Sequence, residues 1–196
     1  MVKFLRRRSP ADETAFADFD PAAFERLPGG PGSAAPEAAV VESILLKLDI
    51  LQGRDKKFRM MRSIARLPRP WVSRVFVGLL ADASDEVREV AARELAERDD
   101  CPLELLHDKL HHPPWYVKSA ILRILGTRGR PESVRHIREA IDDPNVDVKR
   151  AAAQALGAIG GKESRALLVG LTRDGNPYVR NAAAEALEKI VELRFS

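Results

Sequence analysis

A short phrase recurs along the chain at an almost constant spacing. In each copy a valine is followed by a basic residue, then by apolar residues three and four positions later and a leucine eight positions later. The copies begin 30 or 31 residues apart, at Val87, Val117, Val148 and Val179. Offsets of three, four and eight lie on one side of an α-helix. Each copy therefore predicts an amphipathic helix, and alanines such as Ala151 and Ala152 permit close approach of a neighbouring helix.

A shorter apolar segment precedes each of these helices, and turn-forming Asp, Asn, Pro or Gly residues separate the two. The shorter segments are residues 71–80, 103–110, 133–141 and 164–171. Residues 36–52 and 56–67 form a fifth, degenerate copy, with Phe58 near the place of the valine. One such hairpin cannot bury its apolar side alone, whereas a stack of hairpins forms a continuous core. We therefore predict an all-α protein, an α-solenoid of about five helical hairpins over residues 36–196.

The composition is that of a soluble globular chain. Of its 196 residues, 45% are hydrophobic and 31% are charged. Because no apolar run approaches the roughly 18 to 20 residues of a membrane span, we expect no such span. The single cysteine, Cys101, cannot form a disulfide within the chain, which is typical of a reducing cytosol. We therefore expect a cytoplasmic protein, and the abundance of Ala and Arg suggests a bacterial one.

The repeated phrase, as in VKRAAAQALG and YVRNAAAEAL, resembles the HEAT repeat, in particular the short form named after phycobilisome bilin lyases. The resemblance covers about four fifths of the chain. It implies a scaffold or adaptor, because most such proteins bind other proteins, while a minority are bilin lyases, iron-dependent hydroxylases or DNA-binding glycosylases. It also implies a ladder in which the basic residue after each valine joins an acidic residue of the preceding turn. The implied ladder cations are Arg88, Lys118, Lys149 and Arg180, with Asp82, Asp143 and Asp174 as partners and an interruption at His112.

The resemblance further implies that the second helix of each hairpin lines a concave surface. The positions two and six residues after each valine then point outward. They hold Glu89, Arg93, Ser119, Arg123, Arg150, Gln154, Asn181 and Glu185. This set is mixed in charge, which is more typical of a protein-binding surface than of a nucleic-acid channel. We therefore predict that another protein binds there.

Residues 1–35 lack the repeat and end in a Gly-Pro-Gly-Ser linker, so we expect a separate N-terminal extension. Four of the seven phenylalanines of the chain lie in it, although solvating disordered segments are poor in aromatic residues. The candidate motif comprises Phe16, Phe19, Phe24 and Leu27. Two interpretations stay open: the motif docks in a groove of a partner, or the segment folds back over the open end of the solenoid.

A basic stripe marks the first repeat. It comprises Lys56, Lys57, Arg59, Arg62, Arg66 and Arg69. Such a stripe is able to bind phosphates, but it also suits the polar outside of a terminal repeat or a protein-binding face. We favour these last two interpretations over nucleic-acid binding. Few aromatic residues accompany the stripe, and residues 82–109 carry ten carboxylates against four cations, which would repel a long polyanion.

Little in the sequence indicates catalysis. His107 and His111 are four residues apart on a predicted helix, a spacing able to hold a metal, but we favour a role at the helix end, where a cation is stabilised by the dipole. There is no Gly-rich phosphate loop and no His-Glu dipeptide of the kind that the hydroxylases carry. Cys101 precedes a helix start, where the pKa of a thiol tends to fall, yet a capping or buried cysteine is favoured. We expect a non-enzymatic scaffold without cofactor or metal, with a bilin-lyase-like subunit as the alternative.

Overall fold

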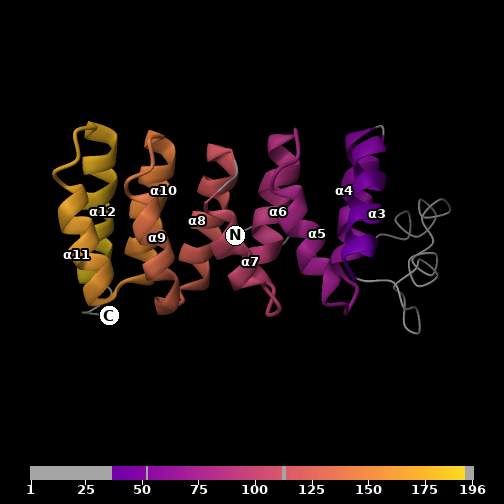
Figure 1. Cartoon of the computed structure of the whole chain (residues 1–196), viewed down its shortest axis with the longest axis horizontal. Helices are drawn as coiled ribbons and strands as arrows, with labels where there is room; N and C mark the ends of the chain where they lie inside the picture. The colour runs from indigo at the N-terminus through magenta and orange to yellow at the C-terminus, as the bar shows by residue number, and fades with distance from the viewer. Residues whose placement is uncertain (1–36, 52, 112–113, 193–196) are drawn as a thin grey trace. The chain divides into compact units, whose positions relative to one another are not determined.

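The computed structural model describes residues 37–51, 53–111 and 114–192, and every regular element in these ranges is helical. The helices, labelled in Figure 1, are α3 (Glu37–Ile50), α4 (Arg54–Ala65), α5 (Trp71–Leu79), α6 (Asp85–Glu97), α7 (Leu103–Lys109), α8 (Trp115–Arg128), η1 (Pro131–Ser133), α9 (Val134–Ala140), α10 (Val146–Ile159), α11 (Gly161–Leu171) and α12 (Pro177–Glu192). They alternate as first and second helices of five hairpins. The predicted all-α class and the five helical hairpins are confirmed. No described helix is long and apolar enough to cross a membrane.

The chain divides into two compact units, residues 1–72 and 73–196, and α5 begins in the first unit and ends in the second. The predicted boundary between residues 35 and 36 lies outside the described residues and stays a prediction.

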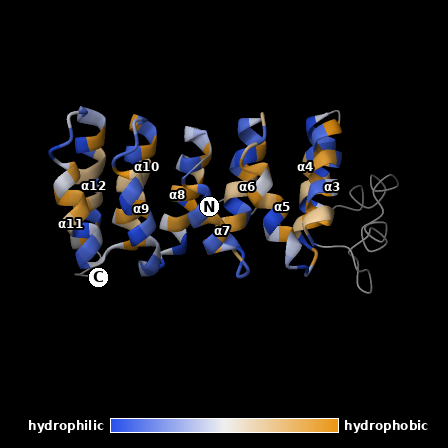
Figure 2. Cartoon of the chain, in the orientation of Figure 1, coloured by the Kyte–Doolittle hydropathy of each residue, from blue (hydrophilic) through white to orange (hydrophobic). Residues whose placement is uncertain are grey.

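In the second unit, the second helices form one layer. α8 packs against α6 and α10, and α10 packs against α12. Figure 1 shows the corresponding hairpins side by side in chain order. The four valines of the repeated phrase are at most 3% exposed, which confirms that they face the core. Both orange and blue residues occur along each of these helices in Figure 2, as amphipathic helices require.

Two glycines set the spacing of this layer. A Cβ atom on Gly126 of α8 would lie 2.9 Å from Ala155 Cα, and one on Gly157 of α10 would lie 2.6 Å from Ala186 Cβ. Real Cβ atoms essentially never come within 3.0 Å of a heavy atom of a residue that is not adjacent in the chain. The second helices are therefore closer together at these points than even an alanine would allow.

Aspartate and asparagine side chains shape the turns before the last two second helices. The side chain of Asp143 accepts a hydrogen bond from the Asn145 amide at 2.8 Å, and the Asn145 side chain caps α10 by accepting from the Asp147 and Val148 amides. Asp174 accepts from the Asn176 amide in the same way. Because these bonds satisfy amides at the start of a helix, the turn chemistry fixes where each second helix begins.

The described part of the first unit consists mainly of the hairpin of α3 and α4. α3 buries Val40, Ile44 and Leu48, while Leu46 and Ile50 on its outer side are 63% and 67% exposed. α4 buries its two methionines and Ile64, whereas its basic residues are exposed or half-buried. Leu46 and Ile50 are one helical turn apart, so they lie on the same side of α3.

Candidate functional site

Two lysines connect neighbouring repeats. Lys118 Nζ on α8 lies 2.8 Å from Asp143 Oδ2, and Lys149 Nζ on α10 lies 2.7 Å from Asp174 Oδ2. In each pair the aspartate belongs to the turn of the following repeat, 25 residues further along the chain, and not to the preceding turn as the resemblance implied. The bond from Lys149 and the amide of Asn176 lower the pKa of Asp174. Burial acts to raise the pKa of Asp143, but the bonds from Lys118 and Asn145 outweigh it and the pKa is lowered.

The two arginines at equivalent positions contact their own turns. Arg180 donates to the carbonyl oxygens of Asp174 and Gly175 at 2.8 and 3.0 Å. Arg88 donates likewise to the carbonyl oxygens of Asp82 and Ala83 and pairs with Asp85. The position in the third repeat that corresponds to Asp143 and Asp174 is held by His112, which lies outside the described residues.

At this interruption the contact from α6 to α8 is aromatic. The guanidinium of Arg88 lies 4.6 Å from the ring centroid of Tyr116, within the range of a cation–π interaction. Trp115 contacts Tyr116 edge to face, with the ring centroids 5.9 Å apart. Trp115 remains 48% exposed, although large aromatic side chains usually bury most of their surface.

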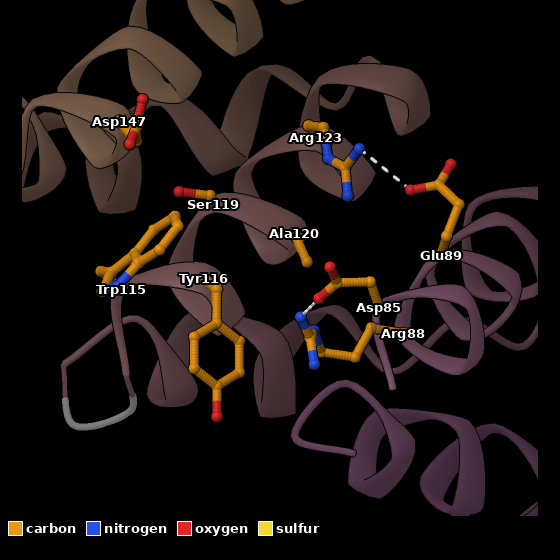
Figure 3. A pocket seen from close by; sticks show the side chains of 9 residues that line it. All are labelled: Asp85, Arg88, Glu89, Trp115, Tyr116, Ser119, Ala120, Arg123 and Asp147. Atoms are coloured by element: carbon orange, nitrogen blue, oxygen red, sulfur yellow. Dashed lines mark ion pairs between the residues drawn. The ribbon is translucent and has the colours of Figure 1, made fainter. Parts of the chain in front are cut away.

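An open pocket of about 450 Å³ lies beside these rings on the exposed side of the second helices, here called the second-helix face. Its lining comes from α6, α8 and α10: Asp85, Arg88, Glu89, Trp115, Tyr116, Ser119, Ala120, Arg123 and Asp147. In Figure 3, Trp115 lies at one side of the pocket and the pair of Glu89 and Arg123 at the other. The pocket thus joins an apolar wall to a charged one.

The charges of the second-helix face are paired but well solvated. Arg123 Nη1 lies 3.1 Å from Glu89 Oε2, with both side chains about half exposed. Arg150 Nη1 lies 3.1 Å from Asp147 Oδ1 in a similarly exposed pair. Pairs of this kind contribute roughly 0–1 kcal/mol, so exchanging them for contacts with another molecule costs little. The Oγ atom of Ser119 is buried and has no hydrogen-bond partner among the described residues.

Of the eight residues predicted for the concave face, the structure places Glu89, Ser119 and Arg123 in the pocket wall. The remaining five lie along the same layer and are exposed or half-buried: Arg93, Arg150, Gln154, Asn181 and Glu185. Arg93 is also 3.8 Å from Glu89. Sequence reasoning missed Trp115, Tyr116 and Asp147. The available signal was an aromatic pair directly before the valine, in the one repeat that lacks the aspartate of the turn.

The basic stripe lies on α4 and the residues after it. Lys56 and Arg66 are exposed, and Lys57, Arg59, Arg62 and Arg69 are half-buried. The guanidinium of Arg54, one turn before Phe58, lies 5.7 Å from the Phe58 ring centroid. The four residues of the N-terminal motif, Phe16, Phe19, Phe24 and Leu27, lie outside the described residues.

The histidine prediction needs correction. His107 is 2% exposed, stacks on His136 with centroids 3.9 Å apart, and has Nε2 3.1 Å from Ser133 Oγ. Burial, and then the neighbouring His136, lower its pKa, so the ring is a neutral core group and not a cation at a helix end. His111 instead lies at the surface, with Nδ1 3.1 Å from Glu139 Oε2. Within the described ranges, no three His, Cys, Asp or Glu side chains are grouped to hold a metal.

Cys101 does not follow the tendency of a thiol before a helix start to have a lowered pKa. The cysteine is half-buried before α7, and desolvation raises the pKa of its thiol more than the nearby Arg128 lowers it. A raised pKa disfavours the reactive thiolate. The favoured interpretation of a packed cysteine agrees with this environment.

Comparison with known proteins identifies the repeat. Residues 103–188 match the family model described as HEAT repeats. The complex of CpcE and CpcF of phycocyanin lyase from Nostoc sp. PCC7120 is similar in structure, with 20% identity, a TM-score of 0.53, and coverage of 84% of this chain and 69% of that one. Human deoxyhypusine hydroxylase in complex with glycerol has 15% identity, a TM-score of 0.50, and coverage of 92% and 83%. No curated protein sequence matches significantly. At these identities the likeness shows a shared fold.

Proposed function

Residues 103–188 are HEAT repeats, and on that premise we propose that the chain is a non-enzymatic, cytoplasmic scaffold that binds a protein partner on its second-helix face. The observation that supports this proposal is the exposed Trp115 in the wall of a pocket formed by three successive second helices. Tryptophan is enriched among the residues that dominate binding energy, and such anchors fill pockets near the centre of an interface.

The charged wall of the pocket supports the same proposal. Glu89, Arg123 and Asp147 present both signs of charge in half-exposed pairs. Charges at the edge of an interface contribute more to selecting a partner and to its rate of association than to affinity. The partner segment therefore combines an apolar side chain against Trp115 with polar groups that meet these pairs.

A crosslinking experiment tests this proposal. A photoreactive side chain replaces Gln154, which is exposed on α10 outside the pocket wall, and in a control chain it replaces Arg165, exposed on α11. In nuclease-treated native lysate, the first chain should crosslink a discrete protein that the control does not.

Substitution of Trp115 tests whether the partner binds at the pocket. Trp115→Ala should abolish the crosslink, whereas Tyr178→Ala, which removes an aromatic ring that is 66% exposed on α12, should retain it. An unchanged crosslink in Trp115→Ala would show that the pocket is not the binding site.

Two of the proteins that share the fold are a lyase and a hydroxylase, so a test for enzymatic activity accompanies the binding test. If the chain is a bilin-lyase-like subunit, incubation with a bilin should produce a strong and stable visible absorption band. Its absence, together with the crosslink, would favour the scaffold.

Binding of nucleic acid by the basic stripe has its own signature. Affinity would fall steeply with salt and would be lost in the combined Arg59→Glu, Arg62→Glu and Arg66→Glu variant. Salt-independent binding, or binding retained by this variant, would contradict that alternative.

A further inference from the structure

The solvent side of α4 is strongly cationic. From Arg54 to Arg66 the chain carries six basic residues and one carboxylate. Arg59, Arg62 and Arg66 follow at spacings of three and four, so they share one side of the helix, away from the buried Met60, Met61 and Ile64. Several like charges on neighbouring turns repel one another, so a segment of opposite charge would be stabilised there.

The N-terminal extension has the matching composition. Residues 12–27 hold five carboxylates, Asp12, Glu13, Asp18, Asp20 and Glu25, against the single cation Arg26. Three phenylalanines and a leucine alternate with these acids. A segment of this kind can bind a surface where arginines pair with its carboxylates and apolar side chains contact its phenylalanines. The hairpin of α3 and α4 offers both, through the stripe and through Phe58, Leu46 and Ile50.

Chain length allows this contact. Nine residues separate Leu27 from the first residue of α3, Glu37, and the ten Cα–Cα steps between the two can span up to about 33 Å. α4 has 12 residues and is therefore about 18 Å long. Tethering raises the effective concentration of the segment at α4 to roughly the millimolar range, so that even a weak ionic contact is populated.

We propose that residues 12–27 bind the solvent side of α4 within the same chain, with their carboxylates on Arg59, Arg62 and Arg66 and their phenylalanines on apolar side chains of the same hairpin. The bound segment covers the basic stripe.

A paramagnetic label on the full chain tests this contact. Cys101→Ser removes the native thiol, and Ala22→Cys places a nitroxide label inside the segment. We expect the amide resonances of α4, and those near Leu46 and Ile50, to broaden selectively at low salt. They should recover in about 0.5 M salt, where the Debye length falls to a few ångströms.

Reversing the charge of the three arginines on α4, and of three basic residues elsewhere, gives a matched pair of variants for the same measurement. The broadening should disappear with Arg59→Glu, Arg62→Glu and Arg66→Glu, and should persist when Lys162, Arg165 and Arg173, exposed at the other end of the chain, become glutamate. Far-ultraviolet circular dichroism of each variant checks that the helices are retained.

Three outcomes would overturn the proposal. The first is that the nitroxide label broadens no amide resonance of α4 more than those of other helices, and the second is broadening confined to α8 near Trp115. The third is that chains without a nitroxide label show the broadening when they are mixed with nitroxide-labelled chains. The second would place the segment in the pocket, and the third would place it on another copy of the chain.

Discussion

At the scale of single residues, Gly157 makes the clearest stability prediction. Its Cβ position lies 2.6 Å from Ala186 Cβ and 3.0 Å from Ala186 Cα, and neither atom is the end of a flexible side chain. Gly157→Ala must therefore push α10 and α12 apart, and it should destabilise the chain by about 1–3 kcal/mol, as overpacking of a core does. Urea unfolding followed by circular dichroism measures the change.

Gly170 provides the control for this substitution. It lies exposed in α11, and a Cβ there would meet no atom within 4 Å. Gly170→Ala should stabilise the chain by roughly 0.5–1 kcal/mol, because alanine restricts the unfolded chain and favours the helix. If both substitutions changed the free energy of unfolding in the same direction, close helix packing at Gly157 would not explain the effect of Gly157→Ala.

His107 predicts a loss of stability on acidification. Burial lowers its pKa in the folded chain, whereas the unfolded chain has an ordinary value of about 6.5. Below that pH the unfolded state binds a proton that the folded state does not, so the free energy of unfolding falls as pH falls. One such proton changes it by at most about 1.4 kcal/mol per pH unit. Urea midpoints at pH 7.5 and 5.5 measure the effect.

The variant His107→Gln isolates this contribution, because glutamine does not titrate and can still reach Ser133. The variant should lose less stability between the two pH values than the parent chain. An unchanged pH dependence in His107→Gln would show that another group controls it.

At the scale of elements, the lysine bridges tie each second helix to the next repeat. The Asp174 carboxylate is 14% exposed and its partner Lys149 is 19% exposed, so water screens this pair less than a surface pair. A double-mutant cycle with Lys149→Met and Asp174→Asn should give a coupling free energy of about 1 kcal/mol, at the upper end for exposed ion pairs. Thermal or urea unfolding of the four chains provides it.

A second ion pair in the same unit serves as the control. Arg138 of α9 and Glu163 of α11 are also 25 residues apart, but both side chains are more than half exposed. The same cycle there should give a coupling near zero and one that added salt removes. Equal couplings for the two pairs would mean that burial does not strengthen the bridge.

The helical hairpins could be predicted because their signal is local. A valine, two alanines and a leucine at helical spacing identify the buried side of α10 without any knowledge of its neighbours. The site could not be predicted in the same way. The stacking of His107 on His136 joins residues 29 positions apart, and the exposure of Trp115 depends on how α8 packs against α6 and α10. Both follow from tertiary contacts that periodicity does not encode.

At the scale of the whole molecule, the two compact units predict two regions of independent stability. In stacked repeats, each element is stabilised by its immediate neighbours, so a local perturbation spreads only through those contacts. Gly157→Ala lies in the second unit, at the contact of α10 with α12. Hydrogen exchange followed by mass spectrometry should therefore show faster exchange in α10 and α12, with α3 and α4 unchanged. The mirror substitution Ile64→Ala, in the buried side of α4, should accelerate exchange in α3 and α4 alone. If either substitution accelerated exchange equally in all helices, the chain would unfold as one cooperative unit and the division at residue 72 would have no energetic meaning.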